Sequence, residues 1–250
     1  LAVQTTPVIQ QYLAIKASHQ DSLLFFRMGD FYELFFSDAE IASAALNIIL
    51  TKRGQHRGKD IPMCGVPFHS AEGYIKTLLD KNMKVAICEQ LETPKEAKKR
   101  GYKEIVKRDV VRIITPGTKL EESFLVQKEN NILMALFFFD NSWASCWIDI
   151  STGLFKSTIS NESHLLSLID QISPKETISY ANKKELSILK SYIPIEVTWL
   201  ESKKNFTRDI LIDYLSSFFD PDRLQKLNTG LLGSISLIVE YLKKNKNLFL

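Results

Sequence analysis

The sequence predicts two α/β domains in tandem. In the first 118 residues, apolar positions switch repeatedly between helical spacing and short strand-like runs, whereas residues 119–250 open with three strand-like runs in succession. The segment from Thr115 through Ser123 separates the two patterns, because turn residues and charges interrupt the apolar stretches there. A chain of 250 residues with 45% apolar side chains suits two modest domains. We therefore place the boundary after residue 118, which gives domains 1–118 and 119–250.

The first domain is predicted to be a mixed-sheet α/β fold. Thr6-Pro7 is typical of a helix start, with threonine as the N-cap and proline at the first helical position. Residues 23–28 and 31–36 should form a hairpin around the turn Gly29-Asp30. Ser37-Asp38-Ala39-Glu40 matches a capping box, so a helix should begin at Ser37. The other expected elements are strands at 48–52, 85–88 and 110–114, a polar loop at 54–60, and a helix capped by Ser70.

The second domain begins with an expected three-stranded meander over residues 132–139, 143–150 and 154–159. Alternating helices and strands follow: helix 162–172, strand 177–180, helix 183–192, strand 195–199 and helix 209–219, with a last helix at 231–246. An antiparallel meander that leads into β-α-β units is the order of ribonuclease-H-like folds. We therefore predict a ribonuclease-H-like α/β fold for this domain.

Charge is distributed unevenly, although the net charge is only +3. Residues 1–118 hold 17 Lys and Arg against 13 Asp and Glu, and residues 119–250 hold 15 against 16. Eight basic residues and three acids lie between Lys95 and Arg112. A run of this kind either attracts phosphates or forms a solvated loop, and the sequence leaves both interpretations open.

Composition argues against secretion and membrane insertion. The longest apolar run ends at Asp140, well short of the roughly 20 residues that a membrane span requires. We find no secretory signal. The three cysteines, Cys64, Cys88 and Cys146, are far apart and form no CxxC pair. We expect a cytoplasmic protein without disulfides, structural zinc or other bound metal.

One string carries a family resemblance. Gly29-Asp30-Phe31-Tyr32-Glu33-Leu34 resembles the Phe-x-Glu mismatch-reading motif of bacterial MutS proteins, which act in DNA mismatch repair. Flanking strings agree with that family in order and spacing: Thr6-Pro7, Leu50-Thr51-Lys52-Arg53-Gly54, Ile61-Pro62-Met63, Gly65-Val66-Pro67-Phe68-His69, Val85-Ala86-Ile87-Cys88-Glu89-Gln90 and Arg112-Ile113-Ile114-Thr115-Pro116-Gly117-Thr118. The resemblance implies a mismatch-recognition domain (1–118) followed by a connector domain (119–250).

The resemblance assigns mismatch binding to Phe31 and Glu33. Residues two apart on a strand face the same side, so both side chains should reach one place, with Tyr32 and Leu34 anchored behind them. A phenyl ring can wedge into a base stack from the minor groove and kink the duplex. Glu33 would contact the mispaired base, either by accepting a hydrogen bond or, when protonated, by donating one. Without the resemblance, Phe31 would more often be a core aromatic and Glu33 a solvated charge.

The resemblance also implies partners and cofactors. Lys52, Arg53 and Arg112 would neutralise phosphates of double-stranded DNA that contains mismatches or small insertion/deletion loops. ATP and Mg²⁺ would bind only the full-length protein, whose clamp, core and ATPase domains are not in this chain. We expect the full-length protein to be a homodimer that is nucleoid-associated and meets a MutL-type partner. The 250 residues alone should be monomeric, non-catalytic and weak in binding DNA.

Three other interpretations fit the sequence less well. A ribonuclease-H-like domain can carry metal-binding carboxylates, but Asp140, Asp149, Asp170 and Asp213 have no spacing that demands convergence. The segment from Gly54 to Asp60 resembles a phosphate loop but has one residue too few and Asp in place of Ser or Thr. The second domain could also serve purely as an interaction module.

Overall fold

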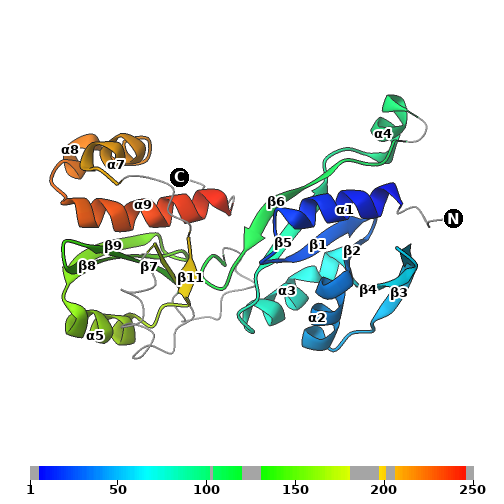
Figure 1. Ribbon diagram of the computed structural model, residues 1–250, viewed down its shortest axis with the longest axis horizontal. Coiled ribbons are helices and arrows are strands. Elements are labelled where there is room, and N and C mark those ends of the chain that lie inside the picture. Colours follow the sequence, from blue (N-terminus) through cyan, green and yellow to red (C-terminus); the bar gives the residue numbers. More distant parts are fainter. Residues whose placement is uncertain (1–5, 102–103, 120–130, 181–196, 201–205, 246–250) are drawn as a thin grey trace. The chain divides into compact units, whose positions relative to one another are not determined.

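The computed structural model describes residues 6–101, 104–119, 131–180, 197–200 and 206–245 (Figure 1). The chain forms two compact units, Leu1–Pro116 and Gly117–Leu250. Each unit holds a mixed sheet covered by helices, which confirms the predicted α/β class. None of the helices in the described ranges is long and apolar enough to cross a membrane.

The first unit is built on a six-stranded sheet with the order β3-β4-β2-β1-β5-β6. Strands β1 and β5 are parallel, and every other neighbouring pair is antiparallel. The elements are α1 (Pro7–Ala17), β1 (Leu23–Met28), β2 (Phe31–Phe35), α2 (Phe36–Leu46), β3 (Thr51–His56), β4 (Lys59–Pro67), η1 (Phe68–Ser70), α3 (Ala71–Leu79), β5 (Val85–Gln90), α4 (Pro94–Arg100) and β6 (Arg108–Ile114). The helix after Thr6 and the β1–β2 hairpin confirm the prediction.

The two faces of this sheet have different cover. Figure 1 shows α1 across one face and α2 and α3 across the other. Side chains alternate along β1, so that Leu24 and Phe26 pack with Tyr12 of α1. Phe25 contacts Tyr32 on the opposite face. The central strands β1 and β2 are therefore fixed from both sides.

The capping box expected at Ser37 is wrong. Helix α2 already begins at Phe36, which adopts a left-handed φ of 55°, and Phe35 at the N-cap makes no side-chain cap. Asp38 instead serves tertiary structure, because its buried carboxylate accepts hydrogen bonds from Leu24 N and the Tyr12 hydroxyl. Helix α2 ends near Asn47, which is left-handed.

The expected loop at 54–60 is also wrong. Strands β3 and β4 form a hairpin there, with His56 paired to Lys59 across the two-residue turn Arg57-Gly58. Both turn residues have positive φ, 49° and 77°, as the tight hairpin turn requires. The segment that resembles a phosphate loop is therefore the tip of a hairpin and does not lead into a helix. Helix α4, within the basic run, was not predicted.

The second unit has a five-stranded sheet with the order β11-β10-β7-β8-β9. Strands β7, β8 and β9 form the antiparallel meander, and β10 and β11 run parallel to β7, which is the predicted ribonuclease-H-like arrangement. The elements are β7 (Ile132–Phe139), β8 (Ser142–Asp149), β9 (Leu154–Ser160), α5 (Glu162–Ile172), β10 (Glu176–Ser179), β11 (Val197–Trp199), α7 (Arg208–Leu215), α8 (Pro221–Leu224) and α9 (Thr229–Lys244).

Alternation along β7 divides the core of the second unit into two layers. Leu133, Ala135 and Phe137 pack with α7 and α9, and Met134 and Leu136 pack with α5. The helix expected at 183–192 lies outside the described residues. The helix expected at 209–219 ends earlier, at Leu215, and is followed by α8, which was not predicted.

Candidate nucleic-acid interface

A tight hairpin places the predicted motif at the turn between β1 and β2 and at the start of β2. Gly29 has a φ of +61°, a left-handed conformation that glycine adopts without steric cost. Arg27 Nε donates to Gly29 O at 2.5 Å, and Phe68 N donates to Asp30 O at 2.9 Å. Both residues of the turn are thus tied to other parts of the unit. The backbone at Phe31, the first residue after the turn, is therefore held in place.

Burial alternates from Phe31 to Leu34 of β2, as predicted. Tyr32 is 6% exposed and Leu34 is fully buried, whereas Phe31 is 48% exposed. The Tyr32 hydroxyl donates to Glu89 on β5, and burial raises the pKa of this phenol far above its usual value. Two anchored side chains thus hold the strand from behind while the Phe31 ring faces solvent.

Glu33 lies on the same strand face as Phe31 and forms an ion pair with Arg53 of β3. Its side chain is only 15% exposed, whereas that of Arg53 is 48% exposed. A second guanidinium, on Arg108, lies close enough for its charge to interact with Glu33. The carboxylate is therefore compensated by cations of the unit itself.

The three predicted phosphate contacts occupy two opposite edges of the sheet. Lys52 and Arg53 lie on the edge strand β3, where Lys52 Nζ is 2.7 Å from Asp60 Oδ2. That bond raises the pKa of Lys52 and lowers the pKa of Asp60. Arg112 lies on the opposite edge strand, β6. The structure brings Arg53 to Glu33 and leaves Arg112 away from both motif residues.

Arg27 and Phe68 are neighbours of the motif to which sequence reasoning assigned no role. The guanidinium carbon of Arg27 lies 3.5 Å from the Phe68 ring centroid and 5.5 Å from that of Tyr32. Such contacts are cation–π interactions. Phe68 is itself exposed and directly follows Pro67, which pairs in register with Phe31. The sequence signals for these two residues are a basic residue just before the turn and an aromatic one within the matching string Gly65-Val66-Pro67-Phe68-His69.

Asp149, the carboxylate considered for a nuclease site, takes part in a local turn. Asp149 Oδ1 accepts hydrogen bonds from Ser151 N at 3.0 Å and Ser151 Oγ at 2.6 Å, which closes a local turn after β8. Among the described residues, no group of three or more His, Cys, Asp or Glu side chains is arranged to hold a metal ion.

Similarity to known proteins shows the family to which the chain belongs. Residues 6–123 match the family model for MutS domain I, and residues 131–250 match the model for MutS domain II. The chain therefore belongs to the MutS family. It is 52% identical over 193 residues to the "DNA mismatch repair protein MutS" of Wolbachia pipientis wMel, which covers 76% of this chain and 23% of that relative. The chain thus spans less than a quarter of the relative's length.

Proposed function

We propose that this chain recognises mispaired or unpaired bases in duplex DNA for mismatch repair, with Phe31 as the wedge. The observation that carries the proposal is the exposed Phe31 ring on a strand whose alternate residues, Tyr32 and Leu34, are buried. Base unstacking costs a few kcal/mol per step, and it costs least at a mismatch. A ring on a rigid strand detects such weak steps with little regard to sequence.

Glu33 is proposed to contact the displaced base. A bare carboxylate beside phosphates would be repelled, and in the unbound unit Arg53 compensates its charge. We propose that Lys52, Arg53 and Arg112 contact phosphates. Lys52 and Arg53 would then exchange their present carboxylate partners for the DNA backbone.

The remaining roles concern the whole protein. We propose that the second unit connects the first to the rest of the protein and to a MutL-type partner. ATP and Mg²⁺ binding and homodimer formation belong to the full-length protein, and this fragment is proposed to be non-catalytic. The setting is the bacterial cytoplasm, in association with the nucleoid.

The decisive experiment compares mismatched with matched duplex in the full-length protein carrying Phe31→Ala. Stacking of an aromatic ring on a base contributes about 1–3 kcal/mol, so preference for the mismatch should fall about 5- to 150-fold. Phe139→Ala is the matched control, because Phe139 has a similar exposure, 42% against 48%, but lies in the second unit. Discrimination that survives Phe31→Ala would refute the wedge.

A further inference from the structure

The basic segment between β5 and β6 forms a projecting arm. Strands β5 and β6 continue past β1, and Leu91 N donates to Lys107 O at 2.9 Å beyond the last paired strand residues. Figure 1 shows α4 at the far end of this arm, away from the helices that cover the sheet. The arm therefore presents α4 to solvent on a two-stranded stem.

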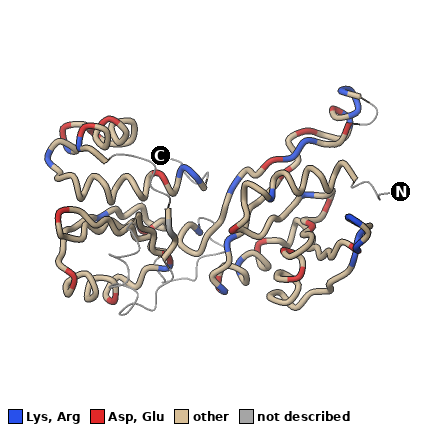
Figure 2. Tube along the Cα trace, in the orientation of Figure 1, with Lys and Arg blue, Asp and Glu red and all other residues tan. Residues whose placement is uncertain are grey.

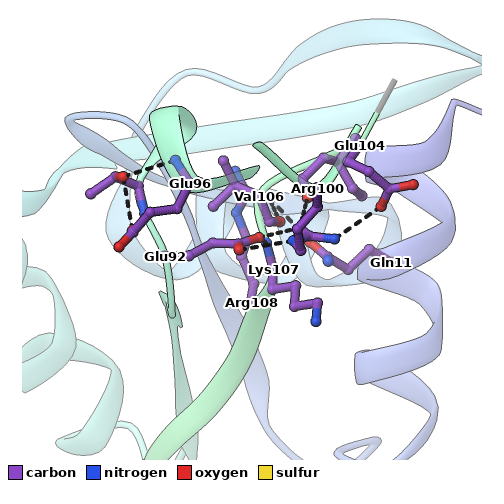
Figure 3. A network of polar contacts seen from close by, with 10 residues as sticks. Gln11, Glu92, Glu96, Arg100, Glu104, Val106, Lys107 and Arg108 are labelled. Carbon is purple, nitrogen blue, oxygen red and sulfur yellow. Dashed lines mark hydrogen bonds and ion pairs between the residues drawn. The ribbon is translucent and has the colours of Figure 1, made fainter. Parts of the chain in front are cut away.

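A polar network joins α4 to the stem of the arm (Figure 3). Glu92 accepts from Arg100 Nε at 3.1 Å and from Lys107 N at 2.7 Å. Arg100 also donates to Glu104 Oε2 at 3.0 Å and to Ile105 O at 2.9 Å. The hydrogen bond from Arg100 and that from the Lys107 amide lower the pKa of Glu92, so this carboxylate stays charged at neutral pH. One arginine thus ties together both acids.

Glu96, the acid within α4, is used in a cap. Thr93 N donates to Glu96 Oε2 at 2.7 Å, and Glu96 N donates to Thr93 Oγ1 at 3.3 Å, which together form a capping box. These bonds lower the pKa of Glu96. The three acids around α4, Glu92, Glu96 and Glu104, therefore stabilise the structure of the arm.

Three lysines share the outer face of α4. Lys95, Lys98 and Lys99 have the i, i+3, i+4 spacing of one helix face, and all three are exposed. Ala97, on the opposite side, is 2% exposed. In the described part of the chain, no ion pair within 4.0 Å is recorded for any of these lysines. Figure 2 shows Lys and Arg positions, in blue, at the tip of the arm.

We propose that this lysine face is a second DNA contact, which binds the phosphodiester backbone of duplex DNA without reading sequence or mismatch. The inference rests on the proposed function, because the arm belongs to the same compact unit as Phe31. Lysines act as point charges that neutralise phosphates. A protein partner would call for an apolar centre, whereas the outer face of α4 offers only ammonium groups.

The test measures the salt dependence of duplex binding. The full-length protein carrying Lys95→Gln, Lys98→Gln and Lys99→Gln is titrated with matched and mismatched duplex at several salt concentrations. Each neutralised phosphate contributes about 0.9 to the slope of log K against log salt, so three contacts contribute about 2.7. Between about 50 and 200 mM salt, a fourfold change, the wild type should lose about 40-fold more affinity than the variant.

A control variant removes the same charge elsewhere. Lys226→Gln, Lys243→Gln and Lys244→Gln change three exposed lysines of the second unit and should leave the slope at the wild-type value. Circular dichroism verifies that both triple variants are folded. Equal slopes for the arm variant and the control would overturn the proposal. Loss of mismatch preference with an unchanged slope would overturn it too, because the lysines would then act at the mismatch.

The two proposals fail separately. Phe31→Ala should lower the preference for mismatched duplex and leave the slope of log K against log salt unchanged. The lysine variant should lower that slope and leave the mismatch preference unchanged. If Phe31→Ala left discrimination intact while the lysine variant lowered the slope, the wedge would be wrong and the backbone contact would stand.

Discussion

Replacing Asp38 by alanine should destabilise the first unit strongly. The carboxylate is 3% exposed and joins three elements of the fold. It accepts from Leu24 N at 3.0 Å and from the Tyr12 hydroxyl at 3.2 Å, and it lies 2.9 Å from Lys16 Nζ. Because β1 continues into the turn before Phe31, this carboxylate also supports the candidate site.

The size of the effect follows from what each partner loses. A buried N–H left without an acceptor, here that of Leu24, costs about 1–3 kcal/mol. Breaking a buried ion pair costs about 3–5 kcal/mol. Lys16 keeps the carbonyl oxygen of Ser22 as an acceptor at 2.6 Å, and the Tyr12 hydroxyl keeps that of Phe35 at 3.1 Å. We therefore expect a loss of about 3 kcal/mol, at the lower end of the ion-pair range.

Urea unfolding is the assay, with two probes that separate the units. All three tryptophans lie in the second unit, so their fluorescence follows that unit alone, whereas far-ultraviolet circular dichroism follows both. Asp38→Ala should move the circular dichroism transition and leave the tryptophan midpoint unchanged. Asp38→Asn keeps an oxygen for Leu24 N but also breaks the ion pair with Lys16, so it should cost less than alanine, about 2 kcal/mol. A loss under about 1 kcal/mol for alanine would refute the argument from the buried charge.

Two further predictions concern packing and charge. A Cβ on Gly233 would lie 2.5 Å from Phe137 Cε1, so Gly233→Ala should lower the free energy of unfolding in urea by about 1–3 kcal/mol. Gly230→Ala, whose Cβ would have its nearest contact at 3.4 Å, should be neutral or stabilising. Equal effects of the two substitutions would contradict the packing argument. In DNA binding, Arg53→Gln should weaken binding to all duplexes less when Glu33 is present than in a Glu33→Gln background, because Arg53 must first give up its pair with Glu33, with a coupling of about 1 kcal/mol. Strict additivity would mean that Arg53 acts on phosphates independently of Glu33.

Regular periodicity made the central elements predictable. Strands β1 and β7 and helix α5 have the predicted bounds, because each has a clear turn or cap signal at its ends. The alternation on β2 likewise predicted that Tyr32 and Leu34 would be buried. These features depend on interactions within a few residues, which a single sequence contains.

The errors arose where tertiary contacts overrule a local pattern. Ser37 to Glu40 fits a capping box, but the left-handed Phe36 starts the helix earlier and Asp38 turns inward to Tyr12 and Leu24. For helix α4, in contrast, the local pattern was correct but was missed. Its signal, Thr93-Pro94 followed by Glu96, is present in the sequence but lies in a run that we interpreted by its charge alone.

The Arg53–Glu33 pair shows why residue roles are harder to predict than strands. Both residues were selected by their place in matching strings, and each was assigned a separate contact with DNA. The register of β2, β4 and β3 brings them together across the sheet, and no local pattern encodes that pairing. Phosphates arriving with a duplex would compete for Arg53, and each ion pair exchanged would free Glu33 for a base. Backbone binding and base contact would then be coupled through one arginine, which additive single substitutions would disprove.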